Sequence, residues 1–181
     1  MTWNAFHHRG EILHTVIETA NARRDGVLPM DLPGVREIFR DELDLLAALS
    51  LKWHARLSGN VERELMHQPL DLEGAVAAAW SRTSAEVPGV RLILDRYTES
   101  PSDPEMAEAL TKAQTKEWLK LAAAAGLSND ESVSAARAGA RVVQRARATE
   151  PVSAAAPRRT TTVGDVATPS LVDRIKAVLA A

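Results

Sequence analysis

Two Glu-x-x-His motifs contain the residues whose types and spacing are suited to binding a metal ion. They are Glu11 with His14 and Glu64 with His67. Residues three apart lie on one face of a helix, so a carboxylate and an imidazole at this spacing can reach one cation. The chain has no cysteine, which leaves carboxylates and histidines as candidate ligands. These four residues are therefore the candidate site for Fe, Mn or Zn.

This pairing resembles the ligand pattern of ferritin-like diiron proteins, in which two Glu-x-x-His motifs act with glutamates from two other helices. The resemblance implies a carboxylate and histidine metal-binding protein as an alternative function. In that family the motifs lie on the second and fourth bundle helices. Here they fall at the start of the first predicted helix and at the far end of the second, or in a short helix that follows it. No second pair of inward glutamates follows. We therefore interpret His14 and His67 as residues at the boundary of apolar helix faces, each beside a glutamate.

The sequence assigns no catalytic residues. A hydroxyl nucleophile needs a histidine and an orienting acid in a defined setting, and the chain has no Gly-x-Ser-x-Gly motif. It also has no Gly-rich phosphate-binding loop. We therefore expect a protein that acts by binding, with no cofactor.

Arg137, Arg141 and Arg145 follow one another at intervals of four and therefore share a helix face. Such a row can contact phosphates, which makes a nucleic-acid-associated accessory protein a second alternative. No stacking aromatic residues accompany the row, and residues 1–133 carry 14 basic and 21 acidic groups. We expect instead a solvated face or a row that pairs with acidic surface.

The end of the chain has the pattern of a tethered docking helix. Residues 149–167 are rich in Pro, Ser, Ala and Thr, which predicts a flexible linker. Residues 168–181 follow as a predicted amphipathic helix, whose apolar positions match the anchors of helix-in-groove recognition. These candidate partner-binding residues are Leu171, Ile175, Val178 and Leu179. Residues 134–181 carry 8 basic and 3 acidic groups, so this part of the chain is basic.

Helical periodicity dominates the sequence, and no alternating strand pattern is found, so we predict an all-α fold. Residues 1–148 are expected to form a bundle of five to six helices. The segments that we expect to be helical are residues 3–23, 33–57, 71–86, 88–98, 103–125 and 128–148. The second one either ends near Gly59, with a short helix following to His67, or runs through. Asp71, Asp103 and a Ser128–Glu131 capping box are the predicted helix starts.

No stretch approaches the ~18 consecutive apolar residues of a membrane span, and the N-terminus has no apolar leader pattern. We therefore expect a cytoplasmic protein. The function that the sequence favours is that of a non-enzymatic helical adaptor or regulator. It would bind a protein partner, or its own copies, through the bundle and the tethered C-terminal helix.

Overall fold

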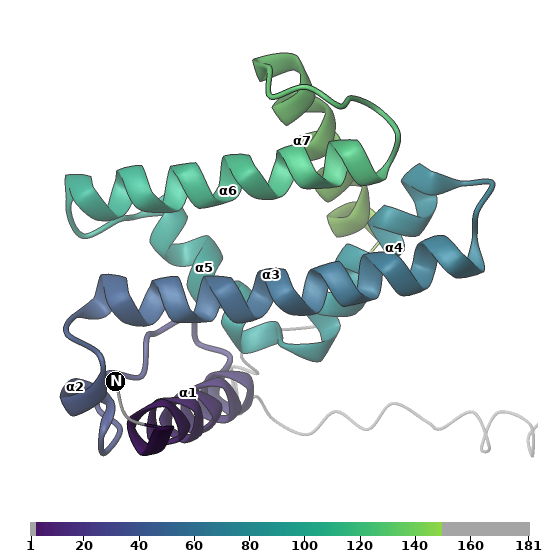
Figure 1. Ribbon diagram of the computed structural model, residues 1–181. Coiled ribbons are helices and arrows are strands. Elements are labelled where there is room, and N and C mark those ends of the chain that lie inside the picture. Colours follow the sequence, from purple (N-terminus) through teal and green to yellow (C-terminus); the bar gives the residue numbers. More distant parts are fainter. Residues whose placement is uncertain (1–2, 150–181) are drawn as a thin grey trace, which may run out of the picture. The chain divides into compact units, whose positions relative to one another are not determined.

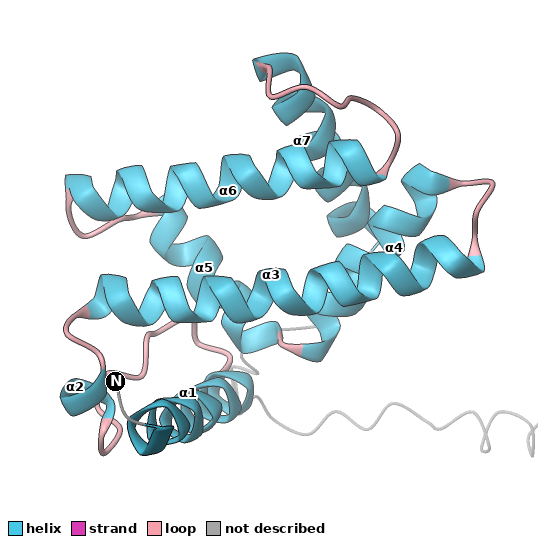
Figure 2. Ribbon diagram, viewed as in Figure 1, coloured by secondary structure: helices cyan, strands magenta, loops and turns pink. Residues whose placement is uncertain are grey.

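Helix-forming sequence dominates the chain, and in a computed structural model, which describes residues 3–149, it forms seven α-helices (Figures 1 and 2). They are α1 (Trp3–Arg23), α2 (Val35–Ile38), α3 (Glu42–His67), α4 (Leu72–Glu86), α5 (Pro88–Glu99), α6 (Pro104–Ala124) and α7 (Val133–Thr149). The described residues contain no strand, which confirms the all-α prediction. The predicted linker and the docking residues Leu171, Ile175, Val178 and Leu179 lie outside the described residues.

Aspartate side chains cap the N-termini of three helices, α3, α4 and α6. Asp71 accepts a hydrogen bond from the backbone N–H of Gly74 at 2.9 Å, and Asp103 accepts one from Met106 at 2.8 Å. Each bond satisfies a donor that the first turn of a helix leaves without an intrahelical partner. Both caps were predicted from the sequence and are confirmed.

The long second helix predicted from residue 33 onward is wrong, because the chain leaves the helix at Phe39. That residue is extended, with φ −108° and ψ 122°, and its side chain is buried. Asp41 then caps α3 by accepting a hydrogen bond from the N–H of Asp44 at 2.7 Å. At the other end α3 runs through Gly59 to His67, so the alternative of an uninterrupted helix is the one observed.

The predicted Ser128–Glu131 capping box is also wrong, because α7 begins at Val133. The cap is Ser132, whose hydroxyl oxygen accepts a hydrogen bond from the N–H of Ala135 at 3.1 Å. Asp130 accepts a hydrogen bond from the N–H of Ser132 at 2.9 Å, which holds the chain in a turn before the helix starts.

Two glycines allow helices to cross at close range. A Cβ atom on Gly89 of α5 would lie 1.9 Å from the backbone oxygen of Ala20 in α1, and one on Gly139 of α7 would lie 1.8 Å from that of Trp118 in α6. Only a residue without a side chain fits at either crossing. The largest fully buried side chains of residues 3–149 include Trp53, Trp80, Phe39, Leu45, Leu46, Leu49, Ile93 and Met106.

Helices α3 and α6 run side by side, and α4 returns along α3 (Figure 1). No helix within residues 3–149 has the length and apolar character needed to cross a bilayer.

Candidate functional site

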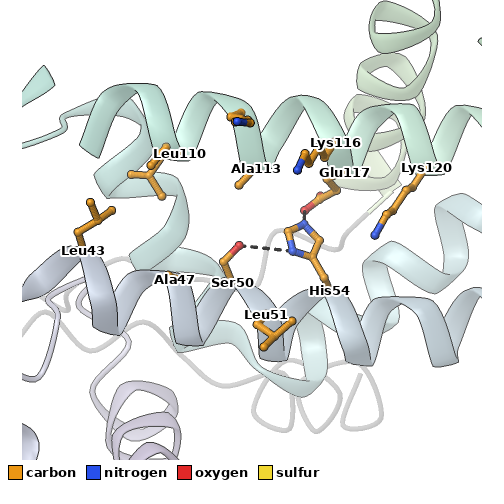
Figure 3. A pocket seen from close by; sticks show the side chains of 12 residues that line it. Leu43, Ala47, Ser50, Leu51, His54, Leu110, Ala113, Lys116, Glu117 and Lys120 are labelled. Atoms are coloured by element: carbon orange, nitrogen blue, oxygen red, sulfur yellow. Dashed lines mark hydrogen bonds and ion pairs between the residues drawn. The ribbon is translucent and has the colours of Figure 1, made fainter. Parts of the chain in front are cut away.

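A groove of about 410 Å³ lies between α3 and α6 (Figure 3). Its lining combines small and apolar side chains with lysines. The residues that line it are Leu43, Ala47, Ser50, Leu51 and His54 of α3, and Ala109, Leu110, Lys112, Ala113, Lys116, Glu117 and Lys120 of α6. A second hollow of about 180 Å³ shares His54, Glu117 and Lys120 with it and extends along the same helices to Val61 and Ala124. Alanines at the facing positions leave this space between the two helices.

The carboxylate of Glu117 lies at the floor of the groove, with 7% of the residue exposed. Each of its oxygens accepts a hydrogen bond from a buried tryptophan. Trp53 Nε1 of α3 donates to Oε2 at 2.8 Å, and Trp80 Nε1 of α4 donates to Oε1 at 3.1 Å. The two indole rings meet edge to face, with centroids 5.7 Å apart. One carboxylate of α6 therefore joins α3 and α4.

Two basic side chains lie close to this buried carboxylate. The Arg91 guanidinium of α5 lies 3.9 Å from Glu117 Oε2 and 2.7 Å from Asp95. It also stacks over the Trp53 ring, 4.7 Å from the centroid. His54 Nε2 lies 3.1 Å from Glu117 Oε2, which is an ion-pair distance when the imidazole is protonated. Charged groups are tolerated in a protein interior when they are paired in this way.

The surroundings of Glu117 hold the pKa of its carboxyl group below the ordinary value of 4.5. Burial is the largest influence and raises the pKa, because it disfavours the charged form. The contact with His54, the positive charge of Arg91 and the N–H of Trp80 together outweigh it. Glu117 is therefore a carboxylate at neutral pH.

Ser50, His54 and Glu117 lie in a row across the groove floor (Figure 3). Ser50 Oγ is 3.4 Å from His54 Nδ1, and His54 Nε2 is 3.1 Å from Glu117. These are the side-chain types of an acyl-transfer triad. However, Ser50 lies inside α3, where the backbone N–H groups donate to carbonyls four residues earlier and are not available to an oxyanion. His54 is thus contacted by Ser50 of its own helix and by Glu117 of α6.

The predicted metal ligands Glu11, His14, Glu64 and His67 do not come together. His14 of α1 is exposed and contacts Glu18 at 3.1 Å, whereas Glu64 of α3 is buried and contacts Arg82 of α4 at 2.9 Å. Glu11 lies 3.8 Å from His8. His67 is exposed at the end of α3.

Within residues 3–149 no three His, Asp or Glu side chains form a group able to hold a metal ion. The described residues therefore form no shared metal site of the kind that the ferritin-like resemblance implies.

The predicted arginine row lies on the exposed surface of α7. Arg145 contacts Glu73 of α4 at 3.1 Å. The next arginine, Arg147, contacts Asp95 of α5 at 2.7 Å and lies over the Trp80 ring, 5.1 Å from its centroid. Arg137 and Arg141 are exposed nearer the start of the helix. The C-terminal end of the row thus meets acidic surface on the bundle.

Sequence reasoning did not find the cluster at the groove floor. One signal for it was present, because a buried tryptophan needs an acceptor for its indole N–H. Trp53 and Trp80 follow apolar residues at helical spacing, so burial of either one would require an acceptor, which the structure identifies as Glu117.

Comparisons of the chain with protein-family models, with curated proteins and with solved structures find no match. The function has to be argued from the geometry of the chain itself.

Proposed function

We propose that the protein is a non-enzymatic helical adaptor or regulator that binds a segment of a protein partner in the α3–α6 groove. The observation that carries the proposal is Leu51, which lines the groove with 70% of its surface exposed. Single exposed leucines are common on protein surfaces. This one belongs to a concave apolar surface that also includes Leu43, Leu110 and several alanines.

The length of the groove suits an extended or helical segment. Together with the second hollow, its α3 side runs from Leu43 to Val61, which corresponds to about 27 Å at the helical rise of about 1.5 Å per residue. A helix of about five turns has the same length. Recognition of an amphipathic helix by an apolar groove between two helices is a recurring binding mode.

The floor of the groove is held by the Glu117 cluster, which supports binding by a preformed surface. Trp53, Trp80 and Arg91 reach Glu117 from α3, α4 and α5. A groove whose walls are already fixed loses little conformational entropy when a partner binds.

The C-terminal anchors predicted from the sequence supply a second contact in this proposal. Leu171, Ile175, Val178 and Leu179 would engage the same partner or a second one. Because they are on the same chain as the groove, even a weak contact adds to the overall affinity through its effective concentration.

Affinity capture from a lysate of the source cells, with four forms of the chain, tests the proposal. The forms are the full chain, Leu51→Glu, the control Val133→Glu, and a chain that ends at Glu150. Val133 lies outside the groove lining and is also 70% exposed, so its substitution adds the same charge at an equally accessible position.

We expect Leu51→Glu to lose a partner that Val133→Glu retains. Loss of a partner by the chain ending at Glu150 would support the C-terminal contact. Identical capture by the full chain and Leu51→Glu would refute the role of the groove.

A further inference from the structure

We infer that the groove binds an acidic amphipathic helix, with partner carboxylates facing a row of three lysines on α6. This inference rests on the proposed function and names the chemistry of the partner. The row consists of Lys112, Lys116 and Lys120, which all line the groove and are all exposed. Intervals of four residues place them along one side of α6, over about 12 Å.

The charge of the groove favours an acidic occupant. Among the described residues that line the two hollows, the acidic ones are Glu62 on the α3 side and Glu117 at the floor. The Glu117 charge is already compensated by Arg91 and contacted by His54. The accessible rim is therefore positive, and complementary charge favours an acidic partner while like charge disfavours a basic one.

The two walls of the groove also indicate where the apolar residues of the partner would lie. Leu51 stands on the α3 wall, and Ala109 and Ala113 on the α6 wall leave room for large side chains between the helices. A helix with leucines at intervals of three and four residues would fill this space. Glutamates on the flank toward α6 would then lie beside the lysines.

Selection of displayed peptides on the full-length protein tests this inference without knowledge of the natural partner. The probe is a library of random 15-residue peptides, counter-selected on the uncharged variant Leu51→Ser so that only groove-dependent sequences are kept. We expect the enriched peptides to combine leucine with aspartate and glutamate. We also expect their binding to weaken as salt rises, because the contacts with the lysines are exposed to solvent.

A charge reversal then separates the contribution of the lysines to peptide affinity from that of the apolar walls. In the variant Lys112→Glu/Lys116→Glu/Lys120→Glu, the affinity of a selected acidic peptide should fall about tenfold or more. A copy of the peptide with lysine in place of each glutamate should recover binding to this variant. Because the three lysines are exposed, the variant should keep its circular dichroism spectrum.

The outcomes distinguish this inference from the function on which it rests. Groove-dependent peptides that are neutral or basic would overturn the acidic partner and leave the groove as a binding site. Failure to recover any peptide that depends on Leu51 would overturn the proposed function as well. Self-association of the full chain that Leu51→Glu abolishes would assign the groove to a second copy and also overturn the inference.

Discussion

Glu117→Gln is the perturbation that most directly tests the buried cluster. Glutamine has nearly the same shape as glutamate but replaces one accepting oxygen with an amide N–H₂ group. In the wild type each carboxylate oxygen accepts one indole N–H, from Trp53 and from Trp80. In the variant one of these N–H groups must face a donor. Arg91 and His54 also lose their contacts with the negative charge.

The size of the effect follows from these lost interactions. A hydrogen bond to a charged group contributes about 1.5–3 kcal/mol, and a buried donor left without an acceptor costs about 1–3 kcal/mol. Arg91 retains Asp95 at 2.7 Å, which limits the remaining electrostatic loss. We therefore expect Glu117→Gln to lower the free energy of unfolding by about 3–5 kcal/mol, the range typical of removing one partner from a buried ion pair.

Urea unfolding followed by circular dichroism measures this loss. Glu108→Gln is the matched control, because it makes the same substitution on the same helix at an exposed position. Exposed substitutions of this kind change stability by about 0.5 kcal/mol or less. A loss below about 1 kcal/mol for Glu117→Gln would refute the view that the buried carboxylate satisfies the two indole N–H groups and balances the charge of Arg91.

The pH dependence gives an independent check on the same group. Because the folded protein holds the Glu117 pKa below its ordinary value of 4.5, the stabilisation is fully present above that pH. It is lost as the pH falls through the lower folded-state pKa. The difference in stability between wild type and Glu117→Gln should therefore be largest near neutral pH and shrink well below pH 4.5. A difference that stays constant into acid would contradict the assignment of a charged carboxylate.

Three further changes test the packing and the helix starts. Gly139→Ala should destabilise the protein by several kcal/mol or prevent folding, because its Cβ would lie 1.8 Å from the oxygen of Trp118. Gly59→Ala should stabilise it by about 0.5–1 kcal/mol, because this site within α3 has no atom within 4 Å of the added Cβ. Equal changes in unfolding temperature for Gly139→Ala and Gly59→Ala would contradict the close crossing of α6 and α7. Asp103→Ala should cost about 1 kcal/mol in urea unfolding by removing the cap to Met106, whereas Asp103→Asn should retain most of it.

Helix starts were predictable where the signal is local. Asp71 and Asp103 cap through bonds to residues three positions later, so a short stretch of sequence contains both donor and acceptor. Trp53 and Trp80 follow apolar residues at intervals of three and four, a spacing that indicates burial, and both are 1% exposed.

The course of the second predicted helix depended on distant residues. The uninterrupted course of α3 through Gly59 is supported by Asn60, which donates to Thr83 Oγ1 of α4 at 2.9 Å. The end of α2 places Phe39 in the core and leaves Asp41 to start α3. An apolar stripe read at helical spacing does not record such a change in backbone direction.

The candidate site was the least predictable part for a related reason. Its members come from four helices, and Glu117 is 64 residues from Trp53 and 37 from Trp80 along the chain. Helical periodicity alone predicts a solvent-exposed position for a glutamate. Only the identity of its buried neighbours reverses that expectation.

The Glu117 cluster also constrains the order in which this protein can fold during synthesis. Trp53, Trp80 and Arg91 leave the ribosome before Glu117, since chains are made from the N-terminus. Until α6 emerges, a collapsed α3–α5 assembly would contain two indole donors without their acceptor and a guanidinium without one of its two anionic neighbours. Helices α1 to α5 are therefore expected to remain loosely packed on the ribosome. Their core would pack tightly in one late step, once α6 has been synthesised and Glu117 can accept the two indole N–H groups.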